Sequence, residues 1–207
     1  MSEALQAASS YHHGDLRQAM LDRAAVVIQS KGIEALSLRG LARDLGVSHA
    51  APNRHFKNKT HLLTAMATDG YTRLKEATLT AAGTVTDDPW VRLNAMGQGY
   101  LHWALDNPAS FNAIMHPDLG FYDNPELDHA LQDFRKSIYD AVAASQTAGR
   151  HENVPLDILN IFTISVPMGA AKMLAQTNNP AELQKNKGLI ADLIELVVPI
   201  RDRTHSK

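Results

Sequence analysis

Apolar residues recur along this chain at spacings of three and four, which is the pattern of a helix with one buried face. The first stripe comprises Leu16, Met20, Ala24, Val27 and Ile28, and Gly32 follows it where a left-handed residue commonly ends a helix. Similar stripes recur toward the C-terminus, and no stretch alternates with a period of two for long enough to make a sheet. The pattern therefore predicts an all-α protein of about nine helices.

Helix starts are marked by a repeated pair, an Asp or Asn followed by a proline. The pairs begin at Asp88, Asn107, Asn124 and Asn179. Asp and Asn side chains accept hydrogen bonds from the free N–H groups of a helix start, and proline is favoured at the first helical position because its missing N–H costs nothing there. We therefore expect four helices to begin at these prolines, and Pro155 to mark a fifth start.

Two short helices are expected directly after the first stripe. Ser37 can cap the first of them, and Gly46 supplies the turn that follows it. Ser48 can cap the second, which we expect to reach about Phe56. This spacing is typical of a helix-turn-helix, whose second helix enters the major groove of DNA, about 12 Å wide. Asn58 is then expected to cap a long helix that leads out of this head.

Composition narrows the class of protein. Apolar residues make up 44% of the 207 positions and charged residues 20%, as in an ordinary soluble globular protein of one or two domains. The chain has no cysteine, which excludes disulfides and thiolate metal sites. No apolar run approaches the roughly 20 residues that a membrane span needs, and the first residues lack the basic and apolar regions of a signal peptide. We therefore expect a cytoplasmic protein without a membrane partner.

The charge is unevenly distributed along the chain, although the net charge is only −2. Residues 1–66 contain eight Lys or Arg and five Asp or Glu, whereas residues 67–207 contain twelve and seventeen. A mildly basic head on an acidic body suits a small DNA-binding protein.

The second short helix, SHAAPNRHF, carries candidate DNA contacts. Ala50 and its neighbours keep the helix thin, while His49, Asn53 and Arg54 supply hydrogen-bond donors. Two lysines, Lys57 and Lys59, follow at the start of the next helix, where they can combine with its N-terminal dipole to hold a phosphate. Arg54 could instead be a solvated surface charge.

Residues 14–66 resemble the N-terminal DNA-binding domain of TetR-type repressors. The resemblance rests on the turn LARDLGVS and on the closing run HFKNKTHLL. It implies an Ω-shaped homodimer on a double-stranded DNA operator, with an effector pocket in the body. The run VSHAAPNRHF looks like one subgroup, whose C-terminal domain carries a Trp-His-Gly signature. Here only VPMGAA stands at the corresponding place, so that signature is incomplete.

The resemblance also assigns roles to single positions of the head. It implies that Ser37 caps its helix beside a phosphate, that Arg39 reaches a base edge and that Lys59 contacts a phosphate. Ser48 and His49 would lie at the tip of the recognition helix. The full set of candidate DNA contacts is Ser37, Arg39, Ser48, His49, Ala50, Asn53, Arg54, Lys57 and Lys59.

Asn53 departs from the family pattern, which usually has a tyrosine at this position. Asparagine can bond a phosphate, or the N6 and N7 atoms of an adenine. The departure therefore predicts that operator preference can differ from that of relatives.

Large apolar side chains in the second half could line a cavity for a small apolar or amphipathic effector. The candidates are Tyr100, Trp103, Phe111, Met115, His116, Phe121, Phe162 and Met168. Each of them, taken alone, is more often an ordinary part of the core. His102 and His116 could anchor a ligand, form a metal pair with Asp106 or Asp118, or be satisfied or solvated histidines, and their spacing matches no metal signature. We expect no metal and no cofactor.

These observations divide the chain into a disordered arm (1–12), a helix-turn-helix domain (13–58) and a helical body for dimerisation and effector binding (59–203). Residues 156–175 are apolar on nearly every face, so this helix is either central to the core or packs on a second subunit as well. The resemblance places the dimer contact in the last two helices, about residues 155–200.

The leading hypothesis is a repressor that an effector releases from a palindromic operator. A second hypothesis keeps DNA binding but leaves the body to dimerisation or a protein partner alone. An enzyme is not expected, because the sequence contains no nucleophile–base arrangement, metal motif or cofactor loop.

Overall fold

The computed structural model describes residues 16–117, 119, 124–175, 177 and 179–197. These ranges comprise nine α-helices and two 3₁₀ turns, without a strand. The predicted all-α fold is confirmed, and the expected arm (1–12) lies outside the described residues.

The head contains the first four elements. They are α1 (Leu16–Lys31), the 3₁₀ turn η1 (Ile33–Ala35), α2 (Leu38–Asp44) and the 3₁₀ turn η2 (Pro52–Arg54). The body contains α3 (Lys59–Gly83), α4 (Pro89–Asp106), α5 (Pro108–Ile114), α6 (Pro125–Thr147), α7 (Leu156–Leu174), α8 (Pro180–Gly188) and α9 (Ile190–Val197).

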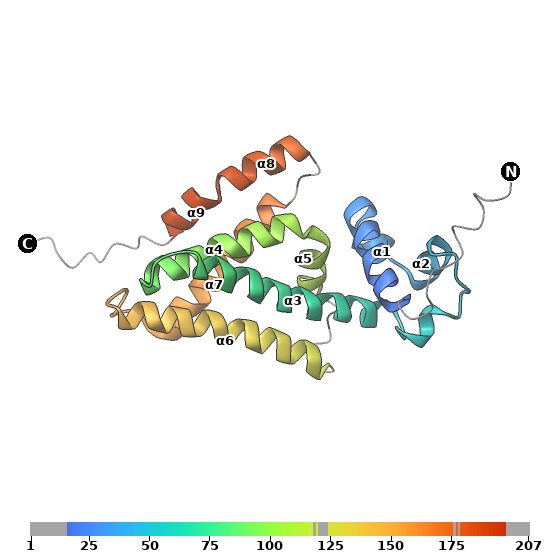
Figure 1. Ribbon diagram of the computed structural model, residues 1–207, viewed down its shortest axis with the longest axis horizontal. Helices are drawn as coiled ribbons and strands as arrows, with labels where there is room; N and C mark the ends of the chain where they lie inside the picture. Colours follow the sequence, from blue (N-terminus) through green and yellow to red (C-terminus); the bar gives the residue numbers. More distant parts are fainter. Residues whose placement is uncertain (1–15, 118, 120–123, 176, 178, 198–207) are drawn as a thin grey trace, which may run out of the picture.

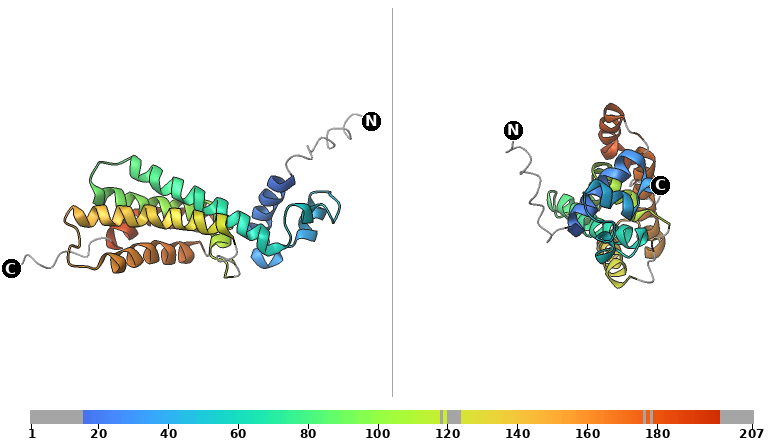
Figure 2. Two further views of the ribbon diagram at one scale, coloured as in Figure 1. Left: turned by 90° about the horizontal axis from the view of Figure 1, so that it is seen from below. Right: turned by 90° about the vertical axis from the view of Figure 1, so that its right-hand side faces the viewer.

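The head lies at one end of an elongated body, and α3 starts beside the head and runs along the body (Figures 1 and 2). Within the body α3 packs against α4, α5 and α6, whereas α7 packs against α4 and α6. The last helix, α9, packs on α4. Short α5 also contacts α1 and η1, so the head touches the body at a second place besides α3.

The predicted helix starts at the four prolines are confirmed. The side chains of Asp88, Asn124 and Asn179 each accept a hydrogen bond of 2.8–3.0 Å from a backbone N–H two or three residues further on. Asn107 behaves differently, because its Nδ2 donates to the Trp103 carbonyl (2.9 Å) at the end of α4. The sequence therefore predicted all four helix starts. It did not predict that the Asn107 side chain bonds the end of α4 and leaves the start of α5 without a side-chain cap.

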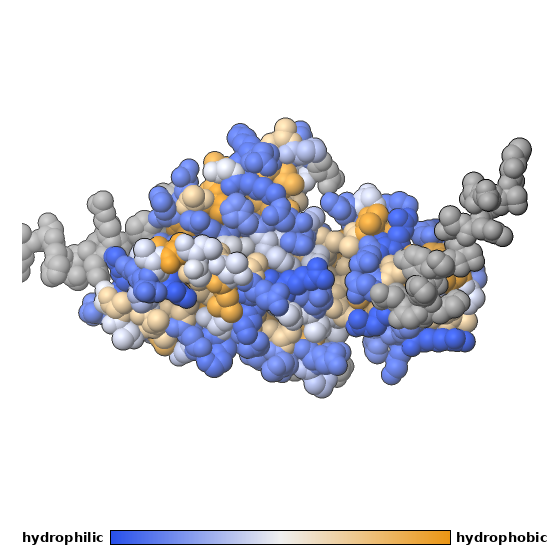
Figure 3. All heavy atoms as spheres, in the orientation of Figure 1, coloured by the Kyte–Doolittle hydropathy of each residue, from blue (hydrophilic) through white to orange (hydrophobic). Residues whose placement is uncertain are grey.

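One hydrophobic core runs through head and body. It includes the predicted stripe of α1 at Met20, Ala24, Val27 and Ile28, and it continues along α3 into the body. Polar residues cover most of the face shown in Figure 3, with small apolar patches between them.

Helix α7 has an uncovered apolar face in the single chain. Ile158, Ile161, Phe162 and Met173 are exposed, with Ile161 at 65% and Met173 at 74%. By contrast α9 buries Ile190 and Ile194 against α4, where the absence of a side chain at Gly97 lets Ile194 approach. Helix α7 is thus not fully enclosed by its own subunit. The prediction that this helix is central to the core holds for only one of its faces.

The crossing of α3 and α4 depends on the absence of a side chain at Gly99. A Cβ at this position would lie 2.8 Å from the Ala81 Cβ and 3.0 Å from the Ala77 carbonyl oxygen. We expect Gly99→Ala to lower the free energy of unfolding by about 1–3 kcal/mol, because backbone on α3 must move. Urea denaturation followed by circular dichroism measures this change.

The matched control is Gly83→Ala at the end of α3, where nothing lies within 4 Å of the added Cβ. Alanine is the better helix former, so the control should gain up to about 1 kcal/mol. Equal effects of the two substitutions would contradict the close crossing of α3 and α4.

Candidate nucleic-acid interface

The first helix of the motif and its turn have the predicted geometry. The N–H of Gly40 donates to Ser37 Oγ (3.1 Å), so Ser37 caps α2. Gly46 has a φ of +67°, and the N–H groups of Gly46 and Val47 donate to carbonyls three and five residues back at 3.2 and 3.0 Å. This pair of bonds is the Schellman motif, which ends a helix by reversing the chain.

The prediction of an α-helix from Ser48 to about Phe56 is wrong. The segment forms only the 3₁₀ turn η2, and no α-helix begins at Ser48. Pro52 is the physical reason, because it has no N–H to donate to the Ser48 carbonyl and its ring would collide with that oxygen. Instead the N–H of Ala51 bonds the Ser48 carbonyl (3.0 Å), and that of Arg54 bonds the Ala51 carbonyl (3.2 Å). Pro52 is buried, which fixes the turn on the head.

The structure leaves eight of the nine candidate DNA contacts exposed and buries part of the ninth. Lys59, the first residue of α3, has a side chain that is 31% exposed. The exposed residues are Ser37, Arg39, Ser48, His49, Ala50, Asn53, Arg54 and Lys57. Their contact with DNA stays a prediction.

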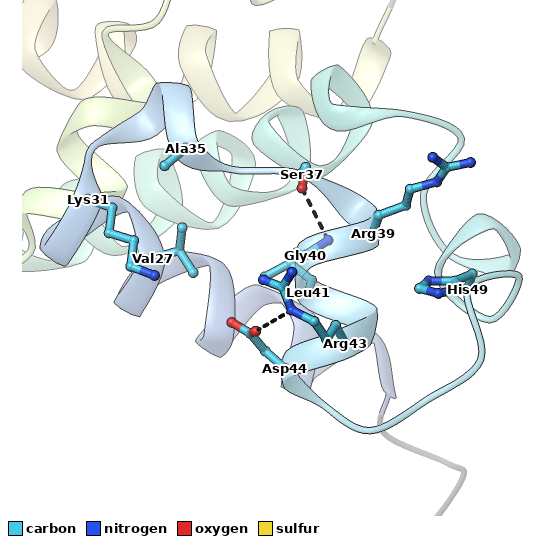
Figure 4. A pocket seen from close by; sticks show the side chains of 10 residues that line it. All are labelled: Val27, Lys31, Ala35, Ser37, Arg39, Gly40, Leu41, Arg43, Asp44 and His49. Atoms are coloured by element: carbon cyan, nitrogen blue, oxygen red, sulfur yellow. Dashed lines mark hydrogen bonds and ion pairs between the residues drawn. The ribbon is translucent and has the colours of Figure 1, made fainter.

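A cleft of about 470 Å³ brings three of these candidates together beside α2 (Figure 4). Ser37, Arg39 and His49 line it, and the figure shows Arg39 and His49 on the same side of the head. Lys31 and Arg43 line the same cleft and were not predicted as site residues. Only the overall basic charge of the head pointed to them, because no motif marks either position.

An ion pair ties α1 to α2. Arg23 donates from Nε and Nη2 to Asp44 Oδ2, at 2.9 and 2.7 Å, and Arg43 Nε lies 3.6 Å from the other carboxylate oxygen. The hydrogen bonds from Arg23 hold the pKa of Asp44 below its ordinary value. Because α2 carries Ser37 and Arg39, this pair holds two candidate contacts on the head.

A second acid in the head faces Lys59. The Lys59 Nζ lies 3.7 Å from Glu34 Oε2, and His116 Nε2 lies 4.0 Å from Glu34 Oε1. Asn58 caps α3 as predicted, since its Oδ1 accepts from the N–H of His61 (2.9 Å). Sequence reasoning singled out Lys59 and His116 for separate roles and missed the carboxylate between them.

The candidate effector residues do not form one group. Tyr100, Trp103 and Phe111 are buried, and the rings of Tyr100 and Phe111 meet edge to face at 6.4 Å. Burial raises the pKa of the Tyr100 phenol far above its ordinary value. Phe162 lies on the exposed face of α7. Of the other candidates, Met115, His116 and Met168 are partly buried, and Phe121 lies outside the described residues.

Three buried oxygen atoms in the body have no hydrogen-bond partner among the described residues. They are Asn94 Oδ1 on α4, Ser145 Oγ on α6 and Asn160 Oδ1 on α7, three helices that pack against one another. Buried polar atoms nearly always have a partner, so these positions call for water or a ligand. The sequence pattern did not indicate them.

Within the described ranges, no three His, Asp or Glu side chains gather as metal ligands would. None of the described helices combines the length and hydropathy of a membrane span.

In the head, a capped helix and a tight turn lead into a 3₁₀ segment where a helix-turn-helix has its second helix, and α3 joins this head to an all-α body. Such an arrangement is typical of helix-turn-helix DNA-binding proteins. Residues 20–66 match the family described as "Bacterial regulatory proteins, tetR family". The head is therefore similar to the DNA-binding part of the tetR family, as the resemblance implied. The assignment to a subgroup stays a prediction.

Curated relatives are similar over about half of their length. An "HTH-type transcriptional regulator" of Mycobacterium tuberculosis is 29% identical over 57% of this chain and 52% of its own. The "Tetracycline repressor protein class D" of Escherichia coli is 31% identical over 53% of this chain and 50% of its own.

Solved structures are similar over nearly the whole chain. A protein of unknown function from a Rhodococcus species has a TM-score of 0.70 at 25% identity, over 92% of this chain and 99% of its own. The fatty acid degradation regulator FadR of Bacillus halodurans has a TM-score of 0.73 at 11% identity, over 90% and 96%. The second likeness shows the fold alone.

The Arg23–Asp44 pair predicts how the stability of the head depends on pH. A carboxyl whose pKa is lowered by folding stabilises the native state above its ordinary pKa, 3.8 for Asp44, and this contribution is lost as the pH falls through the lower folded value. Arg23→Gln should therefore melt below the parent protein near neutral pH, and the gap should narrow below about pH 4. Thermal melting across this range measures the gap. The control Arg39→Gln removes the same charge from the head, and a gap of the same shape in the control would contradict the role of the pair.

Proposed function

We propose that the protein is a dimeric transcription repressor that binds a palindromic operator and is released from it by a small effector. The observation that carries this proposal is the exposed set of donors from Ser37 to Lys57, displayed on a tetR-family head around a capped α2 and a fixed turn. A protein with this function acts in the cytoplasm and has no enzymatic activity.

In this proposal the head divides its contacts between bases and phosphates. Arg39 and His49 line one cleft and supply the donors for base edges, for which an arginine prefers guanine O6 and N7. Lys57 and Lys59 lie at the start of α3, where the N-terminal dipole of the helix adds to their attraction for phosphate. Phosphate contacts hold the register of the head, and base contacts select the sequence.

A second copy of the chain is the proposed cover for the apolar face of α7. Ile158, Ile161 and Phe162 lie on that face, and an exposed apolar patch of this kind marks an interface. A symmetric dimer presents two heads, which must lie about one helical turn of DNA apart, or a multiple of it, to read a palindrome.

The proposed effector site lies in the body, among α4, α6 and α7, whose buried oxygens have no hydrogen-bond partner in the part of the chain that the structure describes. Asn94, Ser145 and Asn160 offer polar groups beside an apolar interior, which is the usual make-up of a small-molecule site. The name of one similar protein, a tetracycline repressor, agrees with a small amphipathic effector. Release requires that the effector bind the two spacings of the heads with different affinity.

Selection of duplex DNA from a random pool tests the proposal as a whole. We expect a palindrome whose half-sites are about one helical turn apart, and we expect a small amphipathic molecule to displace it. Recovery of an asymmetric single site, or of no sequence at all, would count against the symmetric repressor.

The division of roles predicts different phenotypes for two substitutions. Lys59→Gln should weaken binding to all sequences alike and reduce the slope of log affinity against log salt by about 1. Arg39→Gln should weaken binding to the selected palindrome by about 1–3 kcal/mol and relax the preference for one base pair. Fluorescence anisotropy at several salt concentrations, with selected and scrambled duplexes, separates the two effects. Identical behaviour of the two variants would refute this assignment.

The interface on α7 predicts that a charge at its centre prevents assembly. Ile161→Asp should convert the dimer to a monomer at micromolar concentration, because a carboxylate loses its hydration in a closed apolar interface. Sedimentation velocity measures the change. The control Leu79→Asp replaces an exposed leucine of α3 and should remain dimeric. A dimeric Ile161→Asp variant would place the interface elsewhere.

A further inference from the structure

We propose that Glu34 tunes DNA affinity by competing with phosphate for Lys59, and that His116 moderates this competition from the body. Glu34 thus acts on the phosphate contact through Lys59 and does not itself contact DNA. The inference rests on the proposed function, because it takes Lys59 to be a phosphate ligand.

The geometry places one carboxylate between a lysine and a histidine from different parts of the molecule. Glu34 belongs to η1 of the head, Lys59 begins α3, and His116 follows the end of α5 in the body. Oε2 of Glu34 lies 3.7 Å from Lys59 Nζ, and Oε1 lies 4.0 Å from His116 Nε2. The two carboxylate oxygens therefore face different partners.

Exposure of the three side chains shows which of them is able to move. The Glu34 side chain is 87% exposed, whereas Lys59 is 31% and His116 only 9% exposed. Burial fixes the imidazole, while the carboxylate can leave its place at little cost. A pair at this distance and exposure is weak, so a DNA phosphate can replace the carboxylate on Lys59.

The competition lowers DNA affinity, because the Lys59 ammonium must leave the Glu34 carboxylate before it binds a phosphate. Removing the carboxylate ends the competition and strengthens binding. Removing His116 has the opposite effect, since Glu34 then loses one of its two partners and its charge stays with Lys59. A residue that only stabilised the head would give neither the gain nor the opposite signs.

Salt provides an independent readout of the same competition. The attraction between Glu34 and Lys59 is largely solvent-exposed, so added salt screens it. The advantage of removing Glu34 should therefore be largest at low salt and fade as salt rises. A change in folding would persist across the same salt series.

The test uses the full-length protein and a fluorescent duplex of random sequence, so that no operator is needed. Glu34→Gln should bind this duplex about 1.5- to 5-fold more tightly at low salt, the range of an exposed ion pair. The control Asp22→Asn removes an exposed carboxylate from α1 and corrects for the general change in charge. His116→Asn should bind more weakly than the parent protein, by a factor in the same range.

The Lys59→Gln variant, used as a background for further substitutions, shows whether Glu34 acts through Lys59. In Lys59→Gln, adding Glu34→Gln should give no gain beyond that of Asp22→Asn in the same background. Melting temperatures of all variants, measured without DNA, show that the changes in affinity do not come from unfolding.

The outcomes separate the inference from the proposed function. If the parent protein shows no salt-dependent binding to duplex DNA, the proposed function fails. If it binds but Glu34→Gln matches Asp22→Asn, or gains equally without Lys59, the inference is overturned and the proposed function stands. Three results together support the inference. Glu34→Gln gains DNA affinity only when Lys59 is present, this gain fades as salt rises, and His116→Asn binds more weakly than the parent protein.

Discussion

The structure depends on α3, which among the described helices is the one that starts at the head and runs along the body. Its first turns bury Leu62 and Leu63 in the core shared with the head, and Leu74 is buried further along. Its surface meets Ile114 of α5 at Gly70, where an added Cβ would lie 3.0 Å from that side chain. Because α3 is packed in both the head and the body, it is the element that connects the packing of one to the packing of the other.

Local signals were sufficient to predict much of this fold. A capping side chain and the proline behind it determine a helix start within a few residues, so Pro89, Pro108, Pro125 and Pro180 were predicted correctly. The prediction of a helix from Ser48 to about Phe56 was wrong because Pro52 outweighs the capping signal of Ser48. Proline has no N–H, so the first helical hydrogen bond, from residue 52 to the Ser48 carbonyl, cannot form. The pairing of Glu34 with Lys59 joins positions with no periodic relation, and only the folded head brings them together.

The two acids that contact cations in the head contribute in different ways. Asp44 accepts two short hydrogen bonds from Arg23 and braces α2 against α1. Glu34 lies at a greater distance from its partners and is far more exposed, so it contributes little to rigidity. The first acid preserves the shape of the binding surface, while the second changes only the charge available there.

These two kinds of contact transmit motion differently. Packed cores tend to switch between discrete arrangements, because close-packed side chains tolerate little continuous deformation. A Coulomb interaction instead varies smoothly with distance. The Glu34 carboxylate lies between Lys59 of the head end and His116 of the body, at 3.7 and 4.0 Å. In the proposed competition, a small change in either distance alters the charge that Lys59 offers to a phosphate, and no packed contact has to break for this to happen.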